Sequence, residues 1–288
     1  MEQSLEALID LLDLEEIENN LFRGVSPDAG WQRVYGGQVL GQALVAASRT
    51  VEPDRHPHSL HGYFLRPGDT TIPILYNVDR IRDGKSFTTR RVVAVQRGKA
   101  IFSMSISFQA DETGFDHQAD MPDVPPPDAL KSEAELLVDY IDQIPEQYRD
   151  SFARARPIEM RPVEQSHNPF KPKKRPPYQA CWMKARESLP TDPRLHQCVL
   201  AYLSDWTLLD TATLPHAVSF AEDNIQVASL DHAMWFHRKF RADEWLLYVQ
   251  DSPSASGARG FNRGLIFNQA GDLVASVAQE GLMREHTT

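Results

Sequence analysis

Alternating apolar and polar positions in the first third of the chain predict a series of short strands. Runs with this period of two cover residues 58–66, 71–82, 86–97 and 99–110. Glycine-containing turns separate them, at Pro67-Gly68-Asp69, at Asp83-Gly84 and at Arg97-Gly98. Because only short turns join these runs, we expect an antiparallel meander.

A strongly apolar segment at 36–47 precedes the meander and predicts a buried helix. It is rich in small residues, and Gly37 and Gly41 lie one turn apart, which allows another backbone to approach closely. A shorter amphipathic helix is predicted at 3–18. One buried helix followed by a meander is an α+β pattern. Its simplest packed form is a helix wrapped by a curved sheet.

The whole pattern occurs twice. Phe64-Leu65-Arg66 followed by Ile74-Leu75-Tyr76 returns as Phe236-His237-Arg238 followed by Leu246-Leu247-Tyr248, at an offset of about 172 residues. The second copy predicts a helix at 194–210 and strands at 178–188, 225–237, 244–252, 258–268 and 272–284. A repeat of this length indicates two whole domains rather than a solenoid of small units.

Residues 111–177 interrupt the pattern. Eleven of the 20 prolines of the chain fall between positions 122 and 177. Within this stretch, apolar residues at helical spacing predict an amphipathic helix over about 129–155. We therefore expect an N-terminal module at 1–112, a proline-rich, partly helical linker at 113–177 and a C-terminal module at 178–288.

Charge and composition narrow the classes of partner and compartment. The net charge of −10 argues against nucleic acid, which needs a basic face. The basic run at 171–175 is usual for a solvated loop, although it could attract an anionic ligand. Cys181 and Cys198 give no disulfide framework. With an acidic N-terminus and no apolar run of membrane-spanning length, we expect no signal peptide, no membrane span and a cytoplasmic protein.

Three side chains in the second copy are candidates for chemistry. Asp205 lies in a strongly apolar helical segment, where burial would raise its pKa toward the range useful for a general base. Ser229 lies on a predicted strand, and Gln279 interrupts an apolar strand with an amide that can position a water. Each also has an ordinary structural reading, as a helix-edge carboxylate or a strand residue with a local partner. The pattern alone leaves both readings open.

Several familiar site types do not fit. The chain has no Gly-x-Ser-x-Gly elbow and no Gly-x-Gly-x-x-Gly loop, which excludes the usual serine hydrolase and dinucleotide patterns. His232 and His237 lie five residues apart on a predicted strand, so they point to opposite faces and make a poor metal pair. For His58 and His61 we favour structural roles over general-base catalysis, because no nearby carboxylate marks either as oriented.

Several segments together resemble one known family. They are YGGQVLGQAL (35–44), HGYFLRPG (61–68), DHAMWFHR (231–238), ARG (258–260) and AQEG (278–281). The chain resembles the acyl-CoA thioesterase II family, which are double-hotdog enzymes, over nearly its whole length. The resemblance implies two hotdog modules in one chain, each a long helix wrapped by a curved antiparallel sheet.

The resemblance also implies an activity and a site. The family hydrolyses acyl-CoA thioesters to a free fatty acid and CoA, without a metal or redox cofactor. Its catalytic aspartate, hydroxyl residue and glutamine match Asp205, Ser229 and Gln279. Asp205 would activate a water that Ser229 and Gln279 orient, and direct attack by Asp205 through an anhydride is the competing route.

Two other classes of function remain open at this point. Hotdog folds also host hydratases and dehydratases of acyl thioesters, which use a histidine with a carboxylate. A non-catalytic acyl-CoA binder is the second, because fold alone does not determine function. By analogy with other hotdog proteins, we expect a homo-oligomer, either a dimer or a tetramer.

Overall fold

The computed structural model describes residues 5–27, 33–144, 146, 149, 157–166, 168–219, 221–222 and 224–286. The elements of the first half are α1 (Leu5–Leu12), β1 (Glu15–Glu18), β2 (Leu21–Gly24), α2 (Gly36–Ser48), β3 (Arg55–Phe64), β4 (Ile74–Asp83), β5 (Phe87–Gln96) and β6 (Lys99–Ala110). Those that follow are α3 (Glu133–Val138), β7 (Ile158–Pro162), β8 (Tyr178–Ala185), α5 (Pro193–Ser204), α6 (Asp210–Thr213), β9 (Ile225–Ser229), β10 (Asp231–Phe236), β11 (Leu246–Ser256), β12 (Arg259–Asn268) and β13 (Leu273–Glu285).

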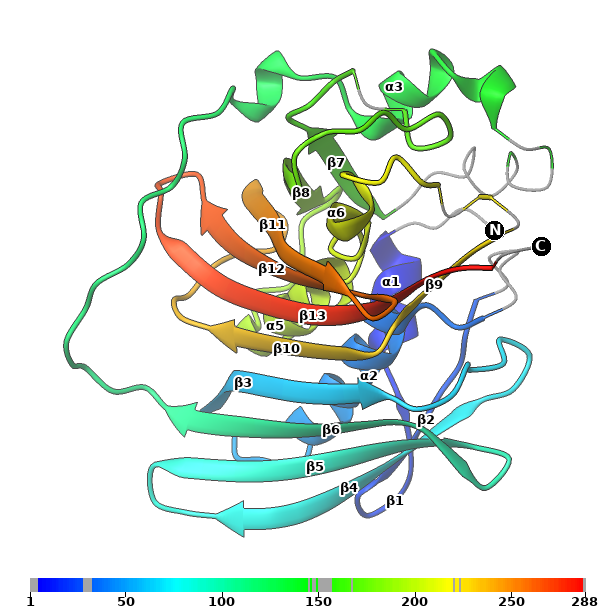
Figure 1. Ribbon diagram of the computed structural model, residues 1–288. Helices are drawn as coiled ribbons and strands as arrows, with labels where there is room; N and C mark the ends of the chain where they lie inside the picture. The colour runs from blue at the N-terminus through cyan, green and yellow to red at the C-terminus, as the bar shows by residue number, and fades with distance from the viewer. Residues whose placement is uncertain are drawn as a thin grey trace.

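Among the described residues, thirteen strands form one antiparallel sheet that curves around α2 and α5 (Figure 1). The order is β1-β2-β4-β5-β6-β3-β10-β13-β12-β11-β8-β7, with β9 also paired to β13. Burial alternates along the strands, as the period of two predicts. On β6, for example, Phe102, Met104, Ile106 and Phe108 are buried. Removing these apolar faces from water holds the sheet against the helices.

The two central helices pack closely because glycines line their contact. A Cβ atom on Gly37 would lie 2.2 Å from the carbonyl oxygen of Tyr202, and one on Gly41 would lie 3.3 Å from that of Cys198. Neither position along α2 has room for an ordinary side chain pointing at α5. The prediction of a close backbone approach at Gly37 and Gly41 is therefore confirmed.

One strand pair joins the two halves. β3 pairs with β10 in antiparallel register, with Tyr63 opposite Asp231 and Ser59 opposite Trp235. Each half thus consists of a helix wrapped by its own strands, and the two sheets continue into one another (Figure 1). The predicted α+β architecture of two helix-and-sheet repeats is confirmed.

The N-terminal helix is shorter than predicted. It ends at Leu12 rather than at 18, and β1 and β2 follow as a hairpin that the sequence analysis did not predict. The hairpin turns at Asn20, whose φ of 63° is a conformation that asparagine tolerates better than most residues. Apolar residues at 14 and 17 continue the helical spacing by chance and caused the error.

The long helix predicted over 129–155 is wrong where the structure describes it. The six residues of α3 form an α-helix that starts with a capping box between Ser132 and Glu135. A 3₁₀ turn at Ile141–Gln143 follows, and Glu146 and Arg149 are again helical. Ile144 is extended because it precedes Pro145, which disfavours helical backbone in the residue before it. Residues 145, 147, 148 and 150–155 of the predicted helix lie outside the described part of the chain.

The same proline-rich region contributes a strand that was not predicted. β7 pairs with β8 and forms the edge of the sheet beyond it. Its last residue is Pro162, which an edge strand tolerates because one of its sides needs no ladder hydrogen bond. The module boundaries at 112 and 177 stay a prediction.

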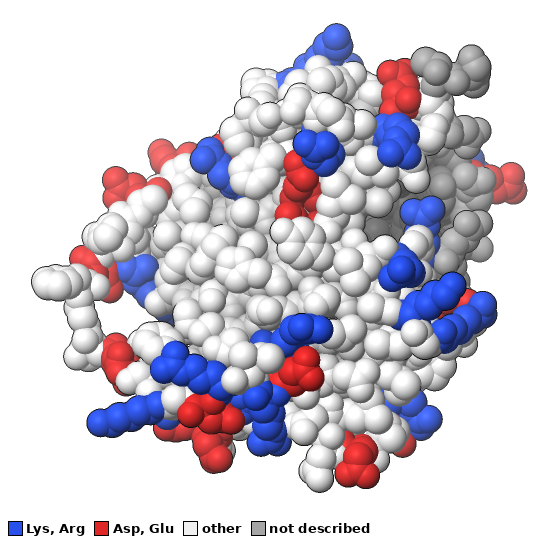
Figure 2. Space-filling model, turned by 60° about the horizontal axis from the view of Figure 1, so that its bottom comes forward, with Lys and Arg blue, Asp and Glu red and all other residues white. Residues whose placement is uncertain are grey.

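Charged side chains of both signs are scattered over the face shown in Figure 2, between broad areas of uncharged residues. Lys and Arg lie beside Asp and Glu there among the described residues, and ion pairs such as Arg91–Asp79 link neighbouring strands. This mixed face lacks the single-sign field that a phosphate backbone requires. No helix in the described part of the chain is long and apolar enough to cross a membrane.

Candidate active site

Asp205 lies at the junction of the two halves. It is the C-cap of α5, since the helix predicted to run to 210 ends at Ser204, and its side chain is buried. The first turn of α2 covers it. The backbone N–H of Gly37 donates to the carboxylate, and a Cβ on Gly36 would lie 2.5 Å from Oδ2. Glycine therefore lets the positive end of α2 reach the carboxylate.

Ser229 and Gln279 converge on the same carboxylate. Ser229 Oγ donates to Asp205 Oδ1 at 3.3 Å, and Gln279 Nε2 donates to that oxygen at 2.5 Å. Ser229 is opposite Gly281 of β13, and Gln279 lies two residues from Gly281 on the same face of that strand. The structure thus brings together the three residues that the sequence analysis selected, although they are up to 74 residues apart.

A β-bulge at Leu230 aims Ser229 at this site. Ser229 is opposite Gly281, whereas Ala233 is opposite Ala278, so one extra residue lies on the β9–β10 side. The Leu230 N–H donates to Glu280 O, and the Glu280 N–H donates to Asp231 Oδ1. The continuous strand predicted at 225–237 is wrong at this point. Bulges commonly redirect side chains next to functional sites.

Burial determines the protonation of Asp205. It raises the pKa of the carboxyl from 3.8 to about 6, against hydrogen bonds from Gln279, Ser229 and Gly37 that lower it. The direction agrees with the sequence prediction. A carboxylate with this pKa is largely ionised at neutral pH and is more basic than an exposed aspartate, which suits it to accept a proton.

His232 belongs to the same cluster, and the sequence analysis missed it. Its Nε2 lies 2.9 Å from Ser204 Oγ and its Nδ1 lies 3.2 Å from Gln279 Nε2. Burial lowers the pKa of the imidazole to about 3, so it is neutral. The alternation His232, Met234, Phe236 on β10 marked the buried face and could have indicated this position.

The other histidines have ordinary partners. His237 is exposed and contacts Ser276 Oγ at 2.8 Å, which confirms that it and His232 point to opposite faces. His58 Nε2 lies 2.8 Å from Ser107 Oγ, and His61 packs edge-on against Trp235. These contacts fit the structural roles favoured for His58 and His61.

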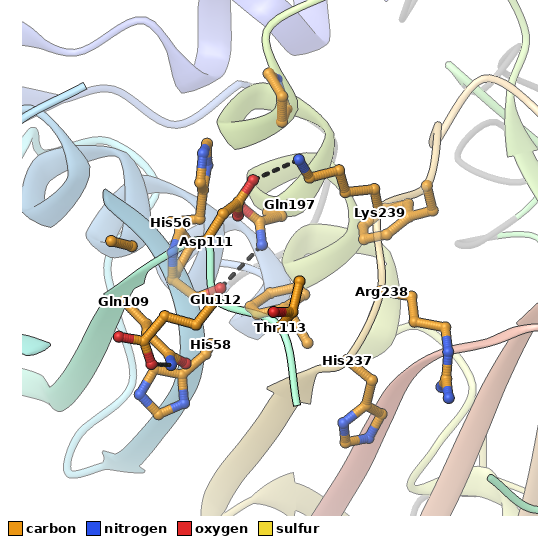
Figure 3. A pocket seen from close by; sticks show the side chains of 15 residues that line it. His56, His58, Gln109, Asp111, Glu112, Thr113, Gln197, His237, Arg238 and Lys239 are labelled. Atoms are coloured by element: carbon orange, nitrogen blue, oxygen red, sulfur yellow. Dashed lines mark hydrogen bonds and ion pairs between the residues drawn. The ribbon is translucent and has the colours of Figure 1, made fainter. Parts of the chain in front are cut away.

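A cavity of about 870 Å³ lies at the other end of α5, between the two halves. His56 and His58 come from one wall and Arg238 and Lys239 from the other, and Lys239 reaches across to Asp111 (Figure 3). Pro57 of this wall precedes Ser229 in the chain by the repeat offset of about 172 residues. The cavity is thus the counterpart, in the first half, of the region around Asp205.

Two other kinds of ligand site lack support in the described residues. Among the described residues, no group of three or more His, Cys, Asp or Glu side chains is arranged to hold a metal ion. In the basic run at 171–175, the backbone N–H of Arg175 donates to Leu214 O. A role for this run in attracting an anion stays a prediction.

Comparison with known proteins assigns the chain to a family. Residues 147–282 match the family described as acyl-CoA thioesterase, and residues 26–109 match the acyl-CoA thioesterase N-terminal domain. Acyl-CoA thioesterase 2 of Haemophilus influenzae is 42% identical over 284 residues, which is 99% of each chain. The chain belongs to the acyl-CoA thioesterase family.

Solved structures agree with this membership. An acyl-CoA thioesterase II, TesB2, from Mycobacterium marinum is 47% identical, with a TM-score of 0.79 over 98% of each chain. A protein from Alicyclobacillus acidocaldarius described as having a hot dog fold matches with a TM-score of 0.77 at 19% identity, over 98% of this chain and 99% of that one. The predictions of a double-hotdog fold and of a thioester hydrolase are confirmed.

Proposed function

We propose that the protein hydrolyses acyl-CoA thioesters to a free fatty acid and CoA, using a water held by Asp205, Ser229 and Gln279. Family membership supports the reaction class. The observation that carries the assignment of residues is the buried Asp205 carboxylate with a pKa of about 6, bonded by the other two side chains.

In this mechanism Asp205 is the general base. Its carboxylate accepts a proton as the water attacks the thioester carbonyl carbon, and the thiolate of CoA leaves when the tetrahedral intermediate collapses. Ser229 Oγ and the amide of Gln279 orient the water. Gln279 Oε1 is buried and has no hydrogen-bond partner among the described residues, which suits it to accept a hydrogen bond from that water.

The developing oxyanion would be stabilised by backbone N–H groups at the start of α2. The first turn of a helix has N–H groups without intrahelical partners and a partial positive charge, which favours an anion. Gly36 has no side chain on the side that faces Asp205, where a Cβ would lie 2.5 Å from Oδ2, so this turn lies directly beside the reacting groups. Such preorganised donors are often the largest single contribution to catalysis of acyl transfer.

The direct test is release of free CoA from short-, medium- and long-chain acyl-CoAs, followed with a thiol reagent. We expect turnover with at least one chain length. A protein that binds acyl-CoA without releasing thiol would be the binder of the alternative reading. A protein that lowers the absorbance of an enoyl-CoA, by adding water to its conjugated double bond, without releasing thiol would be a hydratase.

A second measurement separates the two chemical routes. Under single turnover in ¹⁸O-water, general-base attack puts the label in the fatty acid and leaves Asp205 unlabelled. Attack by Asp205 through an anhydride transfers the label to its carboxylate when water opens the anhydride at that carbon. Mass spectrometry of the peptide containing Asp205 distinguishes the outcomes.

The compartment and the oligomeric state of the protein are also proposals. We expect a cytoplasmic protein that forms a homo-oligomer, a dimer or a tetramer, as the sequence analysis predicted. Light scattering coupled to size exclusion measures the mass directly against the 32.6 kDa of one chain. A peak at the mass of one chain across micromolar concentrations would contradict the oligomer.

A further inference from the structure

Gln279 can face Asp205 in two orientations, and only one of them supports the reaction. With Nε2 toward Asp205, the amide donates to the carboxylate and leaves Oε1 available. With the amide reversed, Oε1 would meet the carboxylate oxygen and the two acceptors would repel. The amide needs a second contact to remain in the productive orientation when Asp205 becomes protonated or the substrate enters.

His232 supplies that contact, and its own hydrogen bonds determine its tautomer. Ser204 Oγ donates its single proton to Ala201 O at 2.9 Å, so it can only accept from His232 Nε2 at 2.9 Å. The proton of the imidazole is therefore on Nε2. Nδ1 is left as an acceptor, and it faces Gln279 Nε2 at 3.2 Å.

We propose that His232 is a positioning residue, whose neutral imidazole holds the Gln279 amide so that Oε1 faces the attacking water. The two amide hydrogens of Gln279 are then both used, one by Asp205 Oδ1 and one by His232 Nδ1. A chain from Ala201 O through Ser204, His232 and Gln279 thus ties the amide to the last turn of α5. This inference rests on the proposed hydrolysis and adds a residue to it.

The environment of the imidazole keeps it in this form. His232 is buried on β10, and burial lowers its pKa to about 3, far below working pH. Three other ionisable groups lie around the cluster: Asp205, Tyr248 on β11 and Asp210 on α6. Asp205 Oδ1 lies 3.8 Å from His232 Nδ1, and the Tyr248 hydroxyl donates to Ser204 O. Tyr248 stays neutral because burial raises its pKa. Burial, together with the charges of Glu133 and Asp205, raises the pKa of Asp210 to about 7, so Asp210 carries only part of its charge at neutral pH.

Three substitutions of one residue separate positioning from packing. In His232→Asn the amide oxygen can occupy the place of Nδ1 and still accept from Gln279. In His232→Gln the amide reaches the place of Nε2, so the contact with Ser204 survives and the acceptor for Gln279 is lost. His232→Leu loses both contacts and keeps the bulk.

We expect kcat for the best acyl-CoA substrate to stay within about fivefold of wild type in His232→Asn. It should fall about 100-fold in His232→Gln and His232→Leu, with little change in KM, because misorientation of one group costs about this much. The acid limb of the kcat/KM profile should also move to higher pH in these two variants. In these variants Asp205 loses the hydrogen bond from Gln279 that lowers its pKa, so its pKa rises.

Equal losses in all three variants, or losses that follow their melting temperatures, would overturn the positioning role while leaving the hydrolase intact. A wild-type protein that releases no thiol from any acyl-CoA would overturn the proposed function, and this inference with it. Nitrogen-15 spectra of the histidine rings give a readout without turnover. We expect His232 to remain the neutral Nε2–H form from pH 5 to 8, and a ring that titrates near 6.5 would overturn the proposal.

Discussion

The two halves carry opposite charges at the same structural position. α5 ends at Ser204 with Asp205 as its C-cap, whereas α2 ends at Ser48 with Arg49 as its C-cap. Asp205 is buried against the start of α2, while Arg49 is exposed, donates to Leu14 O and pairs with Asp13. A base can form only at the end of α5, because a guanidinium does not lose its proton.

The strands repeat the same contrast. A register irregularity lies next to Pro57 on β3, as the bulge at Leu230 lies next to Ser229. Ser107 and Pro57 precede Gln279 and Ser229 by the repeat offset of about 172 residues. Ser107 bonds His58 rather than a carboxylate. The two modules therefore share the irregularity in strand register, but only in the second module do a serine and a glutamine at these positions bond a buried carboxylate.

The largest effect should come from separate substitutions of the two C-cap residues, Asp205 of α5 and Arg49 of α2. Asp205→Asn removes the base, and we expect kcat to fall by about 10²–10⁴. Arg49→Gln at the corresponding position should leave kcat within about threefold of wild type. Thiol release measured for both variants checks this, and a comparable loss in the two would mean that the halves do not differ in chemistry.

A single methyl group at the start of α2 should have the next largest effect. The Cβ in Gly36→Ala would meet Asp205 Oδ2 at 2.5 Å, so the carboxylate must move away from the helix end. We expect a loss of about 100-fold in kcat, the usual cost of a displacement of about 1 Å. Gly98→Ala serves as a control because its Cβ would meet no atom within 4 Å, although its φ of 72° costs some stability.

A smaller effect should follow from the hydroxyl on β9. Ser229→Ala leaves Asp205 bonded by Gln279 and Gly37 and removes one contact to the water, so we expect about a tenfold loss of kcat. Ser229→Thr keeps the hydroxyl and should retain most of the activity. Steady-state kinetics on both variants test this, and a Thr variant as poor as the Ala variant would show that the hydroxyl itself is not what matters.

The smallest expected effect is on stability, and it has the opposite sign. The pKa of Asp205 is about 6 in the folded protein against 3.8 as the ordinary value, so its ionisation opposes folding. This cost is absent below pH 3.8, grows up to about pH 6 and is complete above it. The free energy of unfolding of Asp205→Asn should therefore exceed that of the wild type by about 3 kcal/mol at pH 7. It should show no gain near pH 3.5, as measured by urea denaturation. A loss of stability at pH 7 would contradict the burial argument.

Periodicity predicted the parts of the fold that alternate strictly. β6 has the predicted limits of 99 and 110 because its apolar residues alternate along the whole strand. The helix at 129–155 failed because helical spacing says nothing of Pro145, which forces Ile144 out of the helix. β7 was not predicted because it is only five residues long and lies at the edge of the sheet. Its pairing with β8 depends on the folded chain and leaves no pattern in the local sequence.

The site could be predicted only in part from local sequence. An isolated aspartate, serine or glutamine has an ordinary structural reading, and the resemblance to a family was needed to select Asp205, Ser229 and Gln279 together. The donors that hold Asp205 from α2 belong to the other half and depend on tertiary packing. The same is true of His232, whose partners Ser204 and Gln279 lie on different elements.

The most direct test of the account is the pH dependence of kcat/KM for the wild-type protein between pH 4.5 and 8. In the proposed mechanism the ionised form of Asp205 is the base, so protonation of this carboxylate should remove activity. We predict a plateau above about pH 7 and a tenfold fall for each pH unit below about 6, matching the pKa of the buried carboxyl. A rate that stays level down to pH 4.5, or a limb that survives in Asp205→Asn, would contradict the assignment of Asp205 as the base.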